Sequence, residues 1–198
     1  IAQTGIPVII SSGMSSWEEL CDCVKIFKER NCNYAIMQCT SEYPCPPEEV
    51  GLNVIDRIKE TYPGIPVGLS DHSEGVWAAI AAWMKGATII EKHFTLSKRM
   101  YGPDAKMSME PEDMKLLCES IKNLEKALQN PVSKENADKF REMKKIFQKS
   151  IVAIREIPKG TVITKDMIGY KKPGIGLETK YYRDILGKKV TRDLSFDD

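Results

Sequence analysis

The chain has 198 residues, of which 42% are hydrophobic and 29% are charged, so it is long and apolar enough to bury a core. Its 29 basic and 28 acidic side chains are interspersed, which argues against nucleic acid and membrane surfaces as partners. No apolar run approaches the roughly 20 residues of a bilayer span, and the N-terminus IAQTGIPVII lacks the features of a signal peptide. The six cysteines form no CxxC pair, which favours free thiols, and we expect a cytoplasmic protein.

Apolar runs and helical patterns alternate through the N-terminal part of the chain. IPVIISSGM predicts a strand, and SSWEELCDCVKIFKERNCN predicts a helix with Ser16 as N-cap and Glu19 in the capping-box position. NYAIMQCTSEYP and PPEEVGLNVIDRIKETYPG predict the next strand and helix, and IPVGLSDH, EGVWAAIAAWMKG and ATIIEKHFT predict a strand, a helix and a strand. Strands that are apolar throughout are typical of parallel β/α units, in either a barrel or a doubly wound sheet.

The later segments have a different pattern. MEPEDMKLLCESIKNLEKALQN predicts an amphipathic helix, and SKENADKFREMKKIFQ predicts a second, charged helix that suits a linker. The remaining residues predict short strands, with turns at Pro158-Lys159-Gly160 and Pro173-Gly174. We therefore expect a domain boundary near residues 146–150.

Polar residues gather where the predicted strands end. In both candidate architectures, the side chains at the carboxyl ends of parallel strands surround the active site. The residues at these ends are Ser11, Ser12, Thr40, Ser41, Ser70, Asp71, His72, Glu91, Lys92 and His93.

The only two histidines of the chain, His72 and His93, occupy equivalent places after two of these strands. Two imidazoles beside acidic residues could bind Mn²⁺, Fe²⁺ or Zn²⁺ and leave coordination positions open for a substrate carbonyl and water. Each histidine could instead be a hydrogen-bonded strand-end residue, but their matching placement favours a metal. The serine and threonine residues at the strand ends precede predicted helices, where they could hold a phosphate or carboxylate or could simply be helix N-caps. The Gly-Pro loop containing Asp104 could grip a polar substrate.

Six segments in order carry a family resemblance: SSGM, CTSEYPCP, PVGLSDHS, GATIIEKHFT, YGPDAKMS, and SIVAIREIPKGTVITKDMI with KKPGIG. This set resembles the sialic acid synthases, which include N-acetylneuraminate synthase and relatives that make legionaminic or pseudaminic acid. The resemblance implies an α/β fold in which residues 1–130 form the second half of a (β/α)8 TIM barrel. Residues 131–149 would form a helical linker, and residues 150–198 an incomplete SAF domain, a small mostly-β, type III antifreeze-like domain of the β-clip kind. By the same resemblance the chain is truncated at both ends.

The resemblance also implies a reaction. Enzymes of this family condense phosphoenolpyruvate with the open-chain aldehyde of an N-acetylated hexose, such as N-acetylmannosamine, and release phosphate. They form a homodimer in which the SAF domain is swapped over the partner's active site. Since the first half of the barrel is absent here, we expect the 198-residue chain alone not to turn over substrate.

The same resemblance assigns roles to individual residues. His72 and His93 would be catalytic ligands of a divalent metal, usually Mn²⁺, with Mg²⁺ or Co²⁺ as alternatives. Lys172 stands where bacterial members often have an arginine that reaches the N-acetyl group, and lysine cannot reproduce that planar fork. The acceptor sugar therefore stays open. The remaining implied substrate contacts are Ser11, Ser41 and Ser70 to phosphoenolpyruvate, and Tyr43 and Asp104 to the sugar hydroxyls.

Two other functions remain possible on the residues alone. One is a metal-dependent aldolase barrel, in which the histidine pair would act on pyruvate without releasing phosphate. The other is a non-catalytic module that binds sugar or a partner subunit, with structural histidines. Phosphate release separates the two enzymes, and stoichiometric metal binding separates both from the module.

Overall fold

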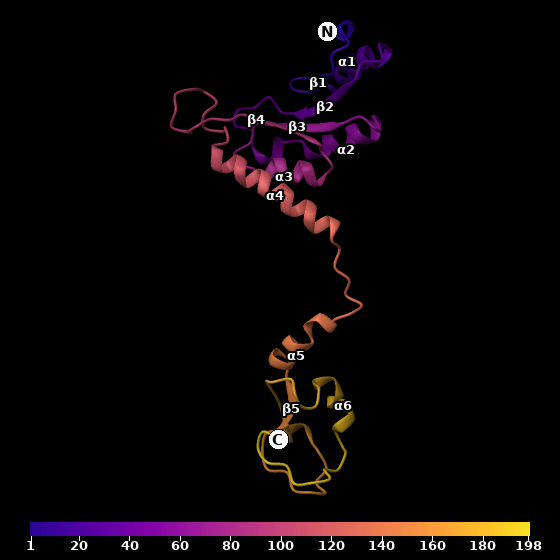
Figure 1. Ribbon diagram of the computed structural model, residues 1–198, viewed down its shortest axis with the longest axis vertical. Helices are drawn as coiled ribbons and strands as arrows, with labels where there is room; N and C mark the ends of the chain where they lie inside the picture. The colour runs from indigo at the N-terminus through magenta and orange to yellow at the C-terminus, as the bar shows by residue number, and fades with distance from the viewer. The chain divides into compact units, whose positions relative to one another are not determined.

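Four parallel strands form the sheet of the N-terminal part of the chain in the computed structural model, which describes all residues 1–198. The strands are β1 (Val8–Ser11), β2 (Tyr34–Cys39), β3 (Val67–Asp71) and β4 (Ile89–Lys92), and the helices are α1 (Trp17–Glu29), α2 (Leu52–Thr61), α3 (Trp77–Met84) and α4 (Pro111–Gln129). The strands lie in chain order and each pairs in parallel with the next, as Figure 1 shows. A doubly wound sheet reverses its strand order, whereas a β/α barrel keeps it, so this arrangement is a barrel segment.

The predicted start of α1 is confirmed. The Ser16 hydroxyl accepts the Glu19 N–H at 3.2 Å, and the Glu19 carboxylate accepts the Ser16 N–H at 2.7 Å, which completes the capping box. This backbone hydrogen bond lowers the pKa of Glu19. The cap fixes the helix start, and the helix then buries Leu20, Val24 and Phe27 against the sheet.

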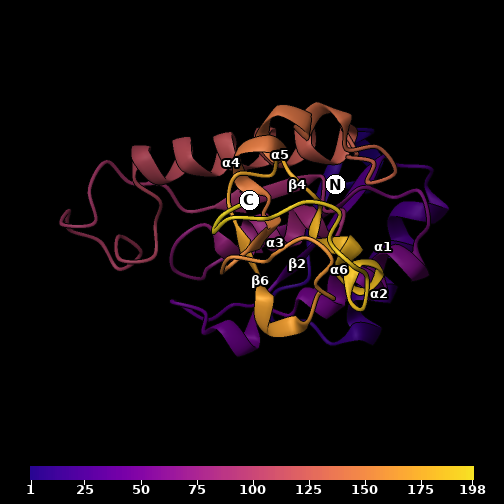
Figure 2. The ribbon, with the colours of Figure 1, turned by 90° about the horizontal axis from the view of Figure 1, so that it is seen from below.

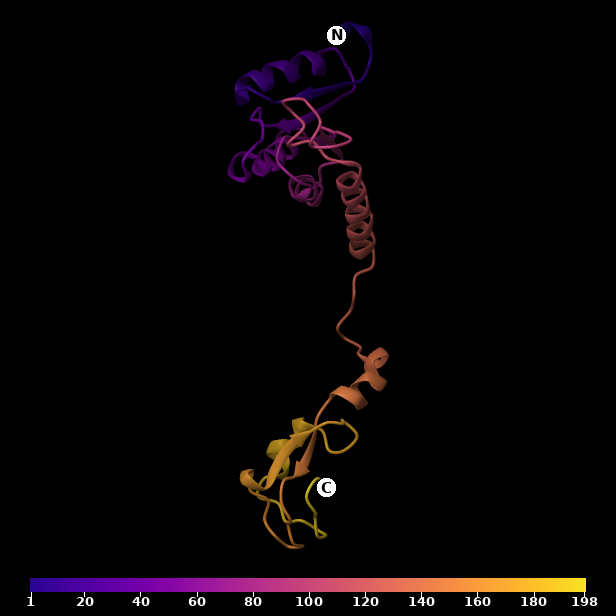
Figure 3. The ribbon, with the colours of Figure 1, turned by 90° about the vertical axis from the view of Figure 1, so that its left-hand side faces the viewer.

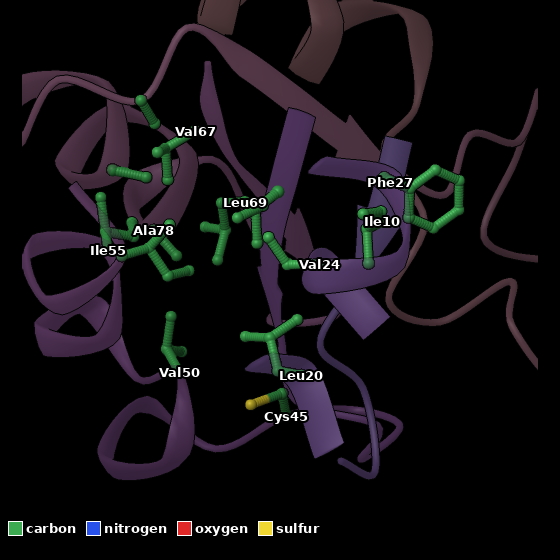
Figure 4. Close-up of a cluster of buried hydrophobic side chains, with 14 residues drawn as sticks. Ile10, Leu20, Val24, Phe27, Cys45, Val50, Ile55, Val67, Leu69 and Ala78 are labelled. Carbon is green, nitrogen blue, oxygen red and sulfur yellow. The ribbon is translucent and has the colours of Figure 1, made fainter. Parts of the chain in front are cut away.

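One face of the sheet, here called the outer face, is covered by α1, α2 and α3. Its core includes Ile10 and Leu69 from the strands and Val24, Ile55 and Ala78 from the three helices (Figure 4). Because side chains alternate along a strand, the strand residues on either side of Ile10 and Leu69 point to the opposite face of the sheet, here called the inner face.

Burial of the inner face differs from strand to strand. All five residues of β3 are buried, but Ile9 on β1 is 56% exposed. Both faces are therefore covered at β3 but not at β1, which lies at the edge of the sheet.

The chain consists of two compact units, Ile1–Pro131 and Val132–Asp198. In the second unit α5 leads into an antiparallel pair, β5 with β6 (Figure 3). A small core packs around Ala153, Ile157 and Val190. The elements of this unit are α5 (Arg141–Phe147), β5 (Ser150–Ala153), β6 (Ile168–Lys171) and α6 (Tyr182–Ile185).

The charged helix predicted over SKENADKFREMKKIFQ is shorter than expected, since α5 is preceded only by a single 3₁₀ turn, Asp138–Phe140. Two side chains compete with helix formation there. The Ser133 hydroxyl accepts the Glu135 N–H at 3.2 Å, and the Asn136 side chain accepts the Asp138 N–H at 2.7 Å. Such local side-chain bonds hold turns and helix starts, so the helix begins late.

Two expectations from composition can be compared with the structure. All six cysteines are free thiols, as predicted. None of the helices combines the length and the apolar character that crossing a membrane requires.

Candidate active site

The ends of β3 and β4 divide their polar side chains between the two faces of the sheet. Ser70 lies opposite Glu91, and Asp71 lies opposite Lys92. The Ser70 hydroxyl donates to Glu91 Oε1 at 2.7 Å on the inner face, whereas Asp71 and Lys92 are buried on the outer face. The strand pairing thus sends the next residue of each strand, a histidine, to the inner face.

The two histidines lie side by side. The ring centroids of His72 and His93 are 5.3 Å apart, with an angle of 65° between the ring planes. His72 Nδ1 lies 2.8 Å from the Thr40 carbonyl oxygen, which can only accept a hydrogen bond. Nδ1 therefore carries the proton in the neutral ring, and Nε2 is left as the basic nitrogen.

A carboxylate, that of Asp104, lies beside His93. His93 Nδ1 lies 3.6 Å from Asp104 Oδ2, which is an ion-pair distance rather than a hydrogen bond. Asp104 belongs to the loop between β4 and α4, which Figure 2 shows extending from the end of the sheet. The loop therefore brings its carboxylate to the second histidine.

This donor set fits a divalent metal. Ligating histidines usually direct their other ring nitrogen to a carbonyl or carboxylate, as His72 and His93 do with Thr40 and Asp104. No group of three or more His, Cys, Asp or Glu side chains has the geometry of a metal cage. A divalent ion held here would have the two imidazoles as its ligands from this chain, and its other coordination positions would be open to substrate and water.

Tyr43 forms one wall beside the histidines. Its ring centroid lies 4.1 Å from that of His72 and 5.9 Å from that of His93. Tyr43 lies in the segment that follows β2, and this segment is anchored by the Cys45 N–H, which donates to the His72 carbonyl oxygen at 2.9 Å. Burial raises the pKa of the Cys45 thiol, and the nearby Glu42 raises it further, so this thiol stays protonated. Tyr43 is half exposed, and a ligand can reach it.

Two further hydroxyls meet around Gly13, at the end of β1. A Cβ placed on Gly13 would lie 2.6 Å from Ser41 Oγ, 3.1 Å from Cys39 Sγ and 3.5 Å from Ser11 Oγ. The three side chains thus form a polar cradle that only glycine leaves open. Cys39 Sγ also lies 4.0 Å from His72 Nδ1, which connects the cradle to the histidine pair.

The structure brings most of the predicted site residues to one end of the sheet. Lys172 belongs to the second unit, where its ammonium lies 5.1 Å from the centroid of the Phe147 ring. The sequence did not single out Gly13 or Cys39, and it gave Glu91 no role beyond its position at a strand end. The strand-end position was a signal for Glu91, but its pairing with Ser70 depends on the strand register. The predicted site residues that lie together at the end of the sheet are Ser11, Ser41, Tyr43, Ser70, His72, His93 and Asp104.

The fold and the site together define a β/α barrel segment with a polar site at the carboxyl ends of its strands. Residues 1–133 match the model of the NeuB family, and residues 148–198 match that of the SAF domain. The chain belongs to the NeuB family and carries an SAF domain, which confirms the resemblance found in its sequence motifs.

Individual relatives agree with this assignment. An uncharacterized protein of Methanocaldococcus jannaschii is 41% identical over all of this chain and 58% of its own length. The N,N'-diacetyllegionaminic acid synthase of Campylobacter jejuni is 34% identical over all of this chain and 60% of its own length. The crystal structure of the N-acetylneuraminic acid synthetase of Leptospira borgpetersenii superposes with a TM-score of 0.62 at 32% identity, covering 72% of this chain and 49% of that one. The chain thus spans about three fifths of the length of the first two relatives.

Proposed function

We propose that this chain is part of a nonulosonic acid synthase, which condenses phosphoenolpyruvate with an N-acetylated hexose such as N-acetylmannosamine and releases phosphate. The observation that carries the proposal is the histidine pair, with ring centroids 5.3 Å apart on the inner face of a NeuB-family barrel segment. Relatives named for different products match the chain at similar identity, so the acceptor is proposed only as a class.

The hydroxyls at the strand ends would bind phosphoenolpyruvate. Ser11 and Ser41 converge at the Gly13 cradle, where their O–H groups can donate to phosphate or carboxylate oxygens. Ser70 lies across the inner face, where its hydroxyl donates to Glu91 Oε1 at 2.7 Å, so it would have to exchange that bond to donate to phosphoenolpyruvate. Hydroxyl donors placed at the strand ends would hold an anion in register, and the resulting catalysis is one of positioning rather than covalent chemistry.

The histidine end of the site would receive the sugar. A divalent ion held by His72 and His93, Mn²⁺ by preference, would supply a Lewis acid that polarises the sugar aldehyde. Tyr43 and Asp104 flank the two imidazoles and can bind sugar hydroxyls. Lys172 of the SAF domain would bind the N-acetyl group, in the active site of a partner subunit of a domain-swapped homodimer. The proposed domains are residues 1–130, 131–149 and 150–198.

The test measures phosphate release from phosphoenolpyruvate with N-acetylmannosamine and with diacetylated 6-deoxy hexoses, with and without Mn²⁺. Because the relatives are longer, the chain is assayed both alone and preceded by the N-terminal barrel strands of a relative. His72→Ala and His93→Ala are compared with the parent protein. We expect Mn²⁺-dependent release with one sugar class from the protein that carries the N-terminal strands, abolished in both variants, and no release from the 198-residue chain alone.

Two other outcomes would favour another function. Mn²⁺ binding through both histidines without phosphate release, combined with turnover of pyruvate, would support the aldolase. An absence of metal binding in every form of the protein would leave a sugar-binding or subunit-binding module.

A further inference from the structure

A salt bridge is buried on the outer face of the sheet, behind the two histidines. Lys92 Nζ lies 2.8 Å from Asp71 Oδ2, and each side chain is 1% exposed. Asp71 is the last residue of β3 and immediately precedes His72, and Lys92 is the last residue of β4 and immediately precedes His93. Because the two strands pair Asp71 with Lys92 directly, the ion pair connects the backbone of one histidine to that of the other.

The ion pair also binds Ser73, so both chain neighbours of His72 are held by it. Asp71 Oδ1 accepts the Ser73 N–H at 2.8 Å, and Lys92 Nζ also donates to the Ser73 carbonyl oxygen. Both contacts are made to the backbone of Ser73 rather than to its side chain. The residues before and after His72 are thus fixed to the residue before His93.

Stability alone does not account for such a pair. Removing two charges from water costs about as much as their attraction returns, and apolar residues of the same volume are often as stabilising. A buried ion pair whose two partners are also hydrogen-bonded to the Ser73 backbone does, however, restrict the geometry of that backbone. Its location directly behind the two imidazoles makes that geometry relevant to the site on the other face.

We infer that Asp71 and Lys92 are positioning residues, which set the spacing and orientation of His72 and His93 and thereby the affinity of the site for a divalent ion. The inference rests on the proposed function, since it concerns the metal site proposed there. The partners that orient metal ligands typically change metal affinity by about 10-fold to 100-fold when they are removed. The ion pair acts one step further back, through the backbone that carries both ligands.

The experiment titrates Mn²⁺ into the metal-free 198-residue chain and follows free Mn²⁺ by electron paramagnetic resonance. The variant Asp71→Asn/Lys92→Met removes both charges at nearly constant volume, so that no single charge is left buried. The matched control is Asp56→Asn/Lys85→Met, which removes a Lys–Asp pair that is 35% and 45% exposed, away from the site. Thermal melting and the ring ¹⁵N shifts of the two histidines are recorded for each metal-free protein.

The double variant is expected to fold and to bind Mn²⁺ at least about 10-fold more weakly, while the control retains the parent affinity. A shift in the ¹⁵N signals of His72 and His93 without metal would show that the effect arises in the apo site. A folded double variant with the parent dissociation constant would overturn the inference and leave the proposed function standing. Failure of the parent protein to bind Mn²⁺, both as the 198-residue chain and when preceded by the N-terminal barrel strands of a relative, would overturn both.

A second variant keeps the inference testable if the double variant does not melt cooperatively. Asp71→Glu retains the charge and moves the carboxylate by one methylene, which alters the geometry of the connection rather than its electrostatics. Weaker Mn²⁺ binding by Asp71→Glu is expected. An unchanged dissociation constant would overturn the inference.

Discussion

Replacing Lys92 by Met tests how much stability is lost when one partner of the buried ion pair is removed. Lys92→Met has nearly the same volume but leaves Asp71 as an unpaired carboxylate in a site where both side chains are 1% exposed. Breaking a buried pair on one side costs about 3–5 kcal/mol, whereas replacing both partners is often neutral. Since a domain is stable by only about 5–15 kcal/mol, Lys92→Met is expected to lose a large share of the free energy of unfolding. Asp71→Asn/Lys92→Met is expected to recover most of it.

Urea denaturation followed by tryptophan fluorescence is a suitable assay. Trp17, Trp77 and Trp83 all belong to the Ile1–Pro131 unit, so the signal reports the unfolding of that unit. The reasoning would be refuted by a loss of less than about 1 kcal/mol in Lys92→Met, the range of a solvent-exposed pair. It would also be refuted if the double variant were as unstable as the single one, because the unpaired charge would then not be the cause.

Three other substitutions have defined outcomes. Gly13→Ala places a methyl group 2.6 Å from Ser41 Oγ, so phosphoenolpyruvate affinity measured by calorimetry should fall about 10-fold or more; unchanged affinity would place the anion elsewhere. Burial and the hydrogen bond to Cys21 raise the pKa of Tyr62 to about 12, so its contribution to stability is present below pH 10 and lost as pH rises toward 12. Tyr62→Phe should remove the last tyrosine to ionise in an alkaline absorbance titration, and a titration that keeps this step would contradict the assignment. The Glu110 N–H and Lys98 lower the pKa of Asp113, so its contribution is present above the unfolded pKa near 4 and lost as pH falls through the lower folded pKa. Asp113→Asn should therefore flatten the acid limb of a stability–pH curve, and an unchanged limb would contradict this.

Much of the fold follows from local sequence. Apolar runs and helical periodicity predicted the four strands and the helices between them, because those signals depend on residues close together in the chain. The capping box at Ser16 was predicted for the same reason. The late start of α5 was not predicted, since side-chain bonds from Ser133 and Asn136 outweigh the helical pattern there.

The candidate site was predicted only in part. Both histidines could be placed at strand ends from sequence, and parallel pairing then required that they share one edge of the sheet. Their family roles came from motifs that resemble the sialic acid synthases. The contacts that orient them, from Thr40 and Asp104, come from other loops and could not be predicted from neighbouring residues.

The sequence by itself determined the order of the strands and helices, the start of α1 and the chemistry available at each strand end. Tertiary structure decided which of those groups meet. Alternation along a strand assigns Ser70 and Asp71 to opposite faces, but only the register with β4 makes Glu91 and Lys92 their partners. A shift of one residue would exchange the faces of one strand, so the histidine pair and the ion pair behind it both depend on that register.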